Sequence, residues 1–314
     1  MEPSVQALSG LSPGRVLKRY LLATRPMFFP ASLLPVAVGS SWGAWTAGRL
    51  DGVALLLALA AIACVHGAVN VLNDVYDDVN GTDRANDGRV FPYTGGSRFI
   101  QNGVLSRDQM QRWAWALLGM ALAPGVGLYL LEGSPVVLFG LAGIALGVLY
   151  SVPPFSLAAR GFGELAVAVG FGVLPVIGAA WLQGAGPDWY VLLLSLPVSV
   201  WVVNILLVNE LPDAIADAGA GKRTLVVRLG GPATATLYAL LAVVALIAAF
   251  GLAMAAKLSL LGLVPMGLLL LLSLDVGRRI IGVGGSGTDE RHAIHTTLTI
   301  HGLGCAWLTV WPWL

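Results

Sequence analysis

The sequence carries little charge, and this scarcity decides the broad class of protein. Only 11% of its 314 residues are charged and 57% are hydrophobic, with a mean hydropathy of +0.80. An ordinary soluble domain is about 25% charged, so a water-soluble globule is excluded. The formal net charge is +1, and we expect no nucleic-acid partner.

Cysteine is also scarce. Cys64 and Cys305 both lie in apolar runs, which excludes a disulfide framework and a paired-thiol metal site. The first 27 residues lack the apolar core of a signal peptide and carry four basic side chains, Arg15, Lys18, Arg19 and Arg25. Residues 1–27 are therefore predicted to form a cytoplasmic or interfacial lead-in.

Long apolar runs recur along the whole chain, each about the length that crosses the hydrocarbon layer as a helix, roughly 20 residues. The sequence predicts an all-α protein: a single membrane domain over 1–314, with about nine transmembrane helices around a central cavity that opens near the cytoplasmic side. The predicted spans are 28–47, 52–73, 113–131, 134–150, 162–183, 189–209, 232–252, 258–274 and 293–313.

The basic residues predict how these spans are oriented. The lead-in and the four long connections, 74–112, 151–161, 210–231 and 275–292, fall on one side of the membrane and carry 16 Lys and Arg residues. The other side carries two, Arg49 and Lys257. Because basic loops stay in the cytoplasm, we expect a multi-pass protein of the cytoplasmic (inner) membrane, with its amino terminus inside and its carboxyl terminus outside.

Acidic residues gather at the ends of two predicted spans. Asp74, Asp77, Asp78 and Asp83 follow the second span, and Glu210, Asp213 and Asp217 follow the sixth. On a helix, a polar stripe of about 100° would run down the second span; its members are His66, Asn70, Asn73, Asp74 and Asp77. Asn209, Asp213 and Asp217 share a face if the helix continues through Pro212; alternatively, Pro212 lies in a first helical turn.

These acids have two interpretations. They can be solvated loop residues without chemistry, or they can hold a cation. Two carboxylates about 4 Å apart repel by roughly 4 kcal/mol at an effective dielectric near 20, and a membrane boundary adds a desolvation cost. Oxygen ligands with open positions suit Mg²⁺ bridging to a diphosphate. The neighbouring cations fit a diphosphate too, or they are ordinary basic loop charge: Arg84, Arg89, Arg98, Lys222, Arg223 and Arg228.

The two clusters also resemble each other. Each has an asparagine followed by spaced aspartates, and Asn73 and Asn209 are 136 residues apart. We interpret this as a weak internal repeat with a site between its halves.

Several motifs, in this order and spacing, resemble the UbiA superfamily of intramembrane prenyltransferases over almost the whole chain. The motifs are Asn73-Asp74-Val75-Tyr76-Asp77 with Gly81-Thr82-Asp83, then Thr94-Gly95-Gly96-Ser97-Arg98, Tyr150-Ser151-Val152-Pro153-Pro154, Arg160-Gly161-Phe162-Gly163-Glu164, and Asn209 to Asp217 with Gly221-Lys222-Arg223-Thr224.

The resemblance implies transfer of an isoprenyl chain from an allylic polyprenyl diphosphate to an aromatic acceptor, with Mg²⁺ as cofactor and the lipid bilayer as surroundings. It implies metal ligands at Asp74, Asp77, Asp83, Asp213 and Asp217, and diphosphate contacts at Lys222, Arg223, Arg25, Arg98 and Asn209. Asn73, Asp77, Asp213 and Tyr150 would be catalytic. The Tyr150 ring would face the allylic cation; alternatively, it is an interfacial belt residue.

One branch of the superfamily is favoured. The 4-hydroxybenzoate branch has an aspartate where this chain has Gly81, whereas Asp83 and the motifs at 94–97 and 160–164 resemble the 1,4-dihydroxy-2-naphthoate polyprenyltransferases of menaquinone synthesis. Against that branch, Asn-Asn-x-Arg-Asp is replaced by Asn-Glu-Leu-Pro-Asp at 209–213. Other acceptors (4-hydroxybenzoate, homogentisate, a lipid or a tetrapyrrole) stay open, as does a membrane transporter.

The histidines are expected to be packing residues. His292, His295 and His301 near the last span are more often interfacial or hydrogen-bonded residues than metal ligands. His66 lies on the polar stripe, and a buried histidine satisfied by a backbone carbonyl is expected there rather than a catalytic base.

Overall fold

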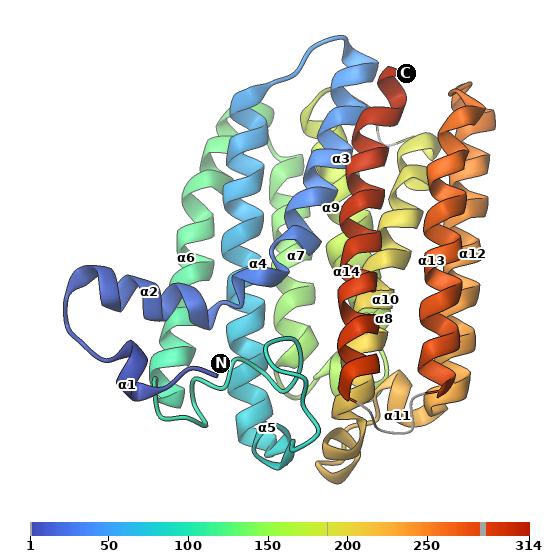
Figure 1. Cartoon of the computed structure of the whole chain (residues 1–314). Coiled ribbons are helices and arrows are strands. Elements are labelled where there is room, and N and C mark those ends of the chain that lie inside the picture. Colours follow the sequence, from blue (N-terminus) through green and yellow to red (C-terminus); the bar gives the residue numbers. More distant parts are fainter. Residues whose placement is uncertain (1, 187, 283–286) are drawn as a thin grey trace.

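A computed structural model describes residues 2–186, 188–282 and 287–314, and these residues form helices and loops without strands. Most of the helices stand side by side in one bundle (Figure 1). The all-α prediction is confirmed. Part of the predicted connection 275–292, residues 283–286, lies outside the described residues.

Long helical segments account for the bundle. They are α3 (Pro30–Ala47), α4 (Gly52–Asn80), α6 (Arg107–Glu132), α7 (Pro135–Ser151), α8 (Gly163–Val167) continued by η3 (Ala168–Val173) and α9 (Leu174–Leu182), α10 (Trp189–Gly219), α12 (Gly231–Ala256), α13 (Leu263–Gly282) and α14 (Gly287–Val310). Within the described ranges, seven of these segments are long and apolar enough to cross a membrane, and α7 is a shorter apolar helix. The last segment, α14, is not among the seven.

Two helices continue past the predicted span ends. α4 reaches Asn80 instead of ending at residue 73, and α10 reaches Gly219 instead of residue 209. α10 passes through Pro212, which lies inside the helix. Except for Asp83, which lies on a short helix after α4, the acidic residues of the two clusters therefore lie on the last turns of two long helices, and not in loops as the predicted connections 74–112 and 210–231 placed them.

Close helix packing holds α3 against α9. A Cβ atom on Gly39 would lie 2.2 Å from the carbonyl oxygen of Val176, so only glycine permits this approach. Pro175 lies in the first turn of α9 and has no amide hydrogen, and the π-helical turn η3 precedes α9. A π-turn is one way to accommodate such a break, and such turns are frequent at functional sites.

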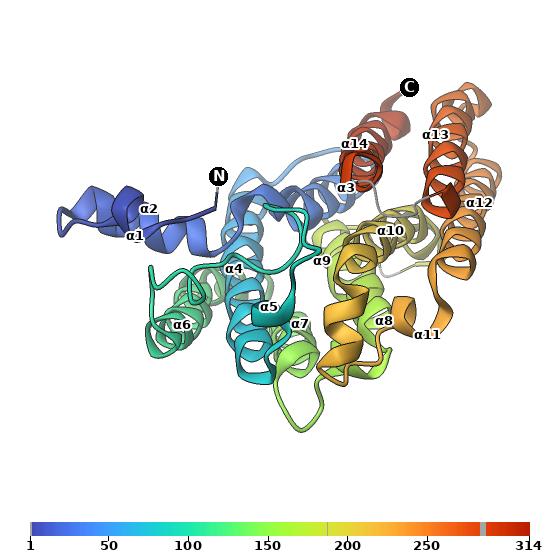
Figure 2. The ribbon, with the colours of Figure 1, turned by 60° about the horizontal axis from the view of Figure 1, so that its bottom comes forward.

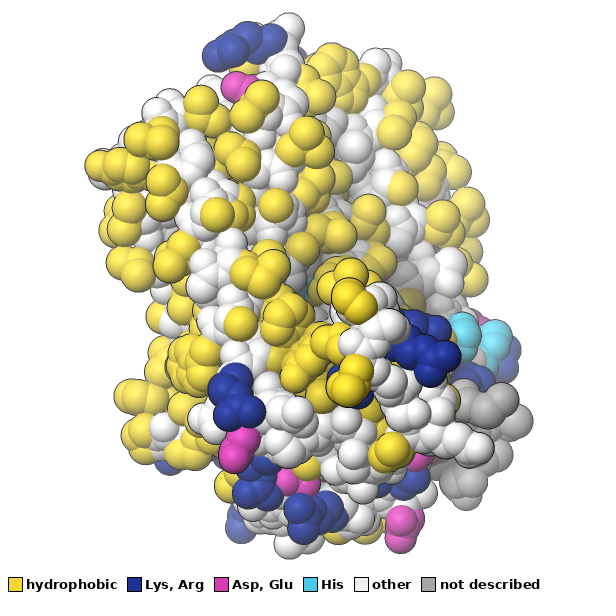
Figure 3. All heavy atoms as spheres, turned by 90° about the vertical axis from the view of Figure 1, so that its left-hand side faces the viewer, with side chains coloured by type: hydrophobic (Ala, Val, Ile, Leu, Met, Phe, Trp, Pro, Cys, Tyr) yellow, Lys and Arg dark blue, Asp and Glu magenta, His cyan; other side chains and the backbone are white. Residues whose placement is uncertain are grey.

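The two ends of the bundle differ. The short helices α5 (Thr82–Ala85) and α11 (Leu225–Leu229) lie at the same end as the last turns of α4 and α10, and the carboxyl terminus lies at the other end (Figures 1 and 2). One face of the molecule is covered by apolar side chains, and charged side chains gather mainly at the lower end (Figure 3). This distribution matches an integral membrane protein.

The lead-in forms α1 (Val5–Leu8) and α2 (Pro13–Ala23), and α2 projects sideways from the bundle (Figure 1). Leu17 and Leu21 are exposed on α2, 64% and 49% of their surface, and Lys18 lies on the same short helix. An exposed helix with apolar and basic residues is typical of a membrane interface.

Candidate active site

A cavity of about 220 Å³ lies among α4, α7, η3 and α10, and both acidic clusters contribute to its wall. Asn73 and Asp77 of α4 face Asp213 and Asp217 of α10 across it, and Asp83 of α5 lies beside them. The rest of the wall mixes polar and charged side chains, among them Arg25 and Lys222, with apolar and aromatic ones, among them Tyr150. The structure thus brings together two segments that the sequence separates by more than one hundred residues.

Lys222 joins the two clusters. Its Nζ lies 2.6 Å from Oδ1 of Asp77 and 3.2 Å from Oδ1 of Asp217. Burial disfavours the charged lysine, but the two carboxylates outweigh that effect and raise the pKa of Lys222 above its ordinary value. Lys222 therefore keeps a positive charge between the two clusters.

Asp213 is oriented by two groups from the connection after α4. The Asn86 side-chain amide donates to Oδ1 at 2.6 Å, and the Gly95 backbone amide donates to Oδ2 at 3.1 Å. Asn86 was missed in the sequence, because no pattern links a loop asparagine to an aspartate 127 residues later. The Thr94-Gly95-Gly96-Ser97 motif was the one signal that pointed to this loop.

Asp74 and Asp83 approach each other beside Gly96. A Cβ atom on Gly96 would lie 2.4 Å from Oδ2 of Asp83 and 3.1 Å from Oδ1 of Asp74, so glycine leaves the space that the two carboxylates occupy. The Ser97 amide donates to Asp74 at 3.1 Å. Burial, together with the negative charges of Asp77 and Asp74, raises the pKa of Asp83 to about 8. A cation bound here would relieve that repulsion.

Arg25 reaches the cavity from the turn before α3. Its guanidinium lies 3.8 Å from Oδ1 of Asp74, donates to the Tyr93 carbonyl at 2.8 Å, and stacks 4.9 Å from the centre of the Phe28 ring. The residue has φ 55°, a left-handed conformation that is uncommon for a side chain of this size. Arg25 is therefore held where a phosphate contact was expected.

The side-chain amides of Asn73 and Asn209, one in each cluster, have different surroundings. Asn73 donates to Oδ2 of Asp77 at 3.1 Å, which orients that carboxylate. The side-chain oxygen of Asn209 is buried and has no hydrogen-bond partner in the described part of the chain. An unpaired buried oxygen suggests a ligand.

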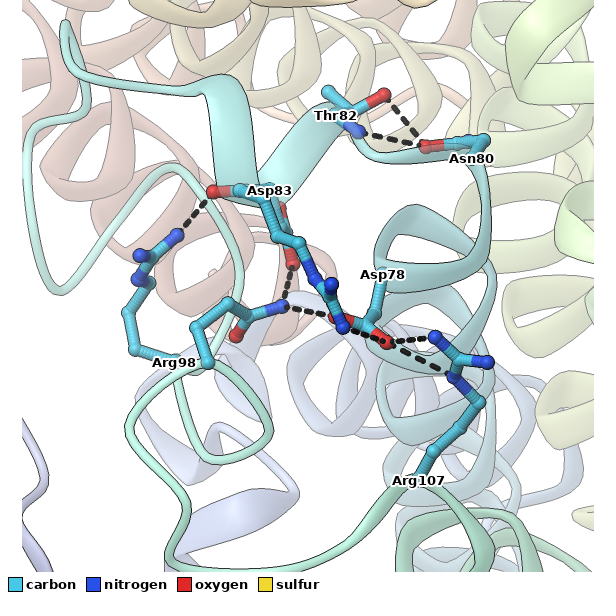
Figure 4. Close-up of polar contacts among 8 residues, drawn as sticks. Asp78, Asn80, Thr82, Asp83, Arg98 and Arg107 are labelled. Atoms are coloured by element: carbon cyan, nitrogen blue, oxygen red, sulfur yellow. Dashed lines mark hydrogen bonds and ion pairs between the residues drawn. The ribbon is translucent and has the colours of Figure 1, made fainter.

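Two of the expected phosphate contacts do not line the cavity. Arg98 is buried and donates to the backbone carbonyl of Asp83 (Figure 4), so it supports the loop instead of facing a substrate. Arg223 is exposed at the surface, and its backbone amide donates to Ala159 at 2.7 Å. The structure does not support direct diphosphate contacts for either residue.

Asp78 belongs to the first cluster in sequence but not to the cavity. Its side chain is fully buried and accepts hydrogen bonds from Arg84 at 3.0 Å and Arg107 at 2.5 Å (Figure 4). It ties the end of α4 to the start of α6. Arg84 is thus a loop anchor, as is Arg89, which pairs with Glu2 at 2.8 Å.

The donor groups at the mouth of the cavity fit Mg²⁺ that arrives with a diphosphate. Within the described ranges, no three His, Cys, Asp or Glu side chains are placed to hold a metal ion by themselves. Mg²⁺ retains several waters and is commonly held by one or two carboxylates plus substrate phosphates. Oδ1 of Asn209, which lines the cavity, is buried without a hydrogen-bond partner, as is Oδ1 of Asp74, which lies behind the lining 3.8 Å from the Arg25 guanidinium. Such oxygens suit this mode of binding.

A second cavity, of about 480 Å³, begins where the first one ends. Ile62, Val65, Gly143 and Gly170 line both, and the second continues among α4, α6, α7 and α9. Its lining is almost entirely apolar. The site as a whole therefore consists of a charged opening in the first cavity, the charged mouth, followed by the apolar second cavity, the apolar chamber.

Sequence and structure comparisons agree on one family. Residues 32–282 match the sequence model of the UbiA prenyltransferase family. The chain is 33% identical over 246 residues to a 1,4-dihydroxy-2-naphthoate octaprenyltransferase of Mycobacterium tuberculosis, covering 78% of this chain and 82% of that protein. It is also 27% identical over 213 residues to a 2-carboxy-1,4-naphthoquinone phytyltransferase of Synechocystis, covering 68% of this chain and 66% of that protein.

A solved structure shows the same fold. It is a UbiA homolog from Archaeoglobus fulgidus bound to GPP and Mg²⁺, with a TM-score of 0.69 and 18% identity, covering 94% of this chain and 100% of that one. At this identity the likeness concerns the fold, which the helical bundle described above shares.

Proposed function

The protein belongs to the UbiA prenyltransferase family, and we propose that it transfers an isoprenyl chain from an allylic polyprenyl diphosphate to 1,4-dihydroxy-2-naphthoate with the help of Mg²⁺. Membership makes the chain a membrane-embedded prenyltransferase and replaces the transporter alternative. The observation that carries the proposal is Lys222 bridging Asp77 and Asp217 at the mouth of an apolar chamber.

The naphthoate acceptor is supported by the relatives. The two named above differ in the chain that they transfer, octaprenyl or phytyl, but share a carboxylated naphthalene nucleus in their names. The acceptor is therefore the better supported part of the substrate assignment. The length of the donor chain would depend on the shape of the apolar chamber.

The diphosphate would lie at the charged mouth. Lys222 and Arg25 are the cations that line the cavity, and their charges would contact phosphate oxygens. Asp74, Asp77, Asp83, Asp213 and Asp217 would hold Mg²⁺ with the diphosphate. Arg98 and Arg223 do not line the cavity and are given no direct phosphate contact.

The bond that breaks is the one between the allylic carbon and the diphosphate oxygen. When bound, Mg²⁺ would stabilise the negative charge that develops on the leaving diphosphate. Lys222 and Arg25 would add to that stabilisation from fixed positions. The aromatic ring of Tyr150 faces the cavity and would stabilise positive charge on the allylic group. The apolar wall would keep water from that group.

We also propose that the charged mouth opens to the cytoplasm. The basic lead-in and the long connections carry 16 of the 18 Lys and Arg residues. Cytoplasmic loops carry the excess of basic residues in membrane proteins, which would place the carboxyl terminus on the outer side of the cytoplasmic membrane.

The experiment is a transfer assay in membranes that contain the protein. It offers 1,4-dihydroxy-2-naphthoate, 4-hydroxybenzoate and homogentisate with one polyprenyl diphosphate, with Mg²⁺ or with a chelator, and identifies products by mass. We expect a prenylated naphthoate product that needs Mg²⁺. Product from another acceptor alone would reject the acceptor assignment, and turnover in the chelator would reject the role of Mg²⁺.

A further inference from the structure

His66 is a buried polar residue in the cavity wall to which the mechanism above gives no task. It lies on α4, is 4% exposed, and lines the cavity together with Ser32 and Phe171. It precedes Asp77 by eleven residues, which is about 16 Å along a helix at 1.5 Å per residue. His66 therefore lies deep in the cavity, beyond the region of the diphosphate.

The hydrogen bonds of Ser32 show which nitrogen of His66 carries the proton. Oγ of Ser32 donates to the carbonyl oxygen of Phe29 at 3.1 Å and lies 2.8 Å from Nδ1 of His66. A hydroxyl group has a single hydrogen to donate. We assign the hydroxyl hydrogen to the Phe29 carbonyl, so that Ser32 accepts from Nδ1. The partner of His66 is a serine side chain, so the sequence-based expectation of a backbone carbonyl partner was wrong.

This arrangement leaves Nε2 of the neutral ring as a free hydrogen-bond acceptor. No hydrogen bond to Nε2 is found in the part of the chain that the structure describes. Phe29 and Phe171 flank the imidazole, with ring centres 5.3 Å and 4.8 Å away. Nε2 is not among the fully buried atoms without a partner, so a ligand in the cavity can reach it.

The two substrates differ in what they offer that nitrogen. An isoprenoid chain has no hydrogen-bond donor and would leave Nε2 unpaired. A hydroxylated aromatic ring has a flat face, which suits Phe171 in the cavity wall, and an O–H group at its edge. The geometry therefore matches the acceptor substrate.

We propose that Nε2 of His66 receives the hydrogen bond, and then the proton, of a hydroxyl group on the aromatic acceptor. This inference rests on the proposed function and extends it by a base on the acceptor side. Ser32 is a positioning residue, since it acts only by holding Nδ1 protonated.

The proton and electron pairs balance as follows. The hydroxyl proton moves to Nε2, and the oxygen electrons make a ring carbon more nucleophilic. That carbon forms a bond to the allylic carbon while the carbon–oxygen bond of the donor breaks and its electron pair leaves with the diphosphate. The ring carbon then loses its own proton to a diphosphate oxygen, and the imidazolium returns its proton to the acceptor oxygen.

The test compares His66→Leu and His66→Gln with a matched buried histidine, His301→Leu. His301 lies on α14 outside the cavity and contacts Cys305 at 3.6 Å. Because a general base contributes about 10²–10⁴-fold, we expect His66→Leu to lower kcat/KM for the acceptor at least 10²-fold. The glutamine of His66→Gln keeps a hydrogen-bond acceptor oxygen but cannot act as a base. Compared with His66→Leu, this variant should therefore recover the wild-type KM for the aromatic acceptor but not the wild-type kcat.

Binding of geranyl diphosphate with Mg²⁺ serves as the independent readout. It should be unchanged in both His66 variants, which shows that they are folded and that the donor site is intact. Wild-type acceptor kinetics in His66→Leu, or wild-type kcat in His66→Gln, would overturn the inference. A wild-type protein that prenylates none of the acceptors would instead reject the proposed function.

Discussion

At the scale of single residues, the site depends on a balance of charge around Lys222. One lysine contacts a carboxylate from each half of the chain, Asp77 on α4 and Asp217 on α10. Opposite charges about 4 Å apart attract by roughly 4 kcal/mol at an effective dielectric near 20. Without substrate, Lys222 therefore holds the two clusters together, and a diphosphate with its metal ion would enter an arrangement that is already in place.

The first prediction concerns Asp77 and Asp213. Changing either to Asn keeps the side-chain volume but removes a charge at the proposed metal and diphosphate site. We expect Asp77→Asn and Asp213→Asn each to lower turnover at least about 10²-fold, the size of effect typical for one preorganised electrostatic group. Turnover is measured at saturating donor with purified protein.

The control for this prediction is Asp275→Asn. Asp275 lies on α13 and pairs with Arg279 at 2.7 Å, with about half of each side chain exposed. Loss of this charge should leave turnover within about twofold, since exposed pairs contribute little. Near wild-type turnover in the Asp213 variant would count against its place in the site.

The second prediction concerns Asp78, which we expect to affect stability and not chemistry. Asp78→Asn removes the charge that holds Arg84 and Arg107. The arginine side chains are 64% and 43% exposed and can turn to water, so the cost should be about 1–3 kcal/mol and less than the breaking of a fully buried pair. Denaturant unfolding in detergent should show that loss while KM for both substrates stays unchanged. A raised KM for the donor would place Asp78 in the site.

These residues also show what the sequence could not predict. Asp77 and Asp78 are neighbours with identical side chains, but one lines the cavity and the other lies on another face of α4 in contact with Arg107. Motif spacing located the clusters, and its assignment of Lys222 to the diphosphate stays a prediction, while the structure places Lys222 between Asp77 and Asp217. The partner of each acid depends on how loops fold back, and neither Asn86 nor Arg98 could be assigned from spacing.

At the scale of helices, hydropathy predicted the positions of the helices better than their ends. Each of the nine predicted spans overlaps a helical segment of the structure, within the described ranges. The errors lie where polar residues begin. Hydropathy falls at Asn73 and at Asn209, but backbone hydrogen bonding continues the helices to Asn80 and Gly219. Hydropathy measures the preference of side chains for lipid, whereas backbone hydrogen bonds determine where a helix ends. A helix can therefore continue beyond the apolar run that hydropathy detects.

The third prediction concerns the junction between the two cavities. Gly143 on α7 lines both, and a Cβ atom there would meet nothing within 4 Å. The ring in Gly143→Phe would therefore extend into the passage. We expect kcat/KM to fall steeply for long polyprenyl diphosphates and little for geranyl diphosphate.

Gly119→Phe is the matched control for this prediction. Gly119 is an exposed helical glycine on α6 that lines neither cavity and has open space around it. The Gly119→Phe variant should keep the wild-type order of kcat/KM among polyprenyl diphosphates of different chain length. An unchanged preference in Gly143→Phe would show that the isoprenoid chain takes another route.

At the scale of the whole molecule, one end of the bundle carries the chemistry and the other carries little charge. The ends of α4 and α10 and the helices α5 and α11 share one end (Figure 2), and side chains from that end line the cavity mouth. The apolar chamber extends from that mouth into the bundle among membrane-spanning helices. A substrate with a charged head and a long apolar tail suits such a division, because each part meets surroundings of its own polarity.

The last prediction tests the orientation of the whole molecule with single cysteines in a Cys64→Ala, Cys305→Ala background. Phe155→Cys lies in the connection after α7, and Ser134→Cys lies in the turn between α6 and α7; both positions are exposed. Because the helix α7 separates them, they must lie on opposite sides of the membrane if α7 crosses it.

With a membrane-impermeant maleimide on intact cells, we expect Ser134→Cys to be labelled and Phe155→Cys to be protected until the cells are opened. The reason is the basic charge at the Phe155 end, since basic loops are retained in the cytoplasm. The reverse pattern would place the charged mouth outside. Labelling of both variants in intact cells would instead mean that α7, at 17 residues, does not cross the bilayer, and the span count would have to be reduced.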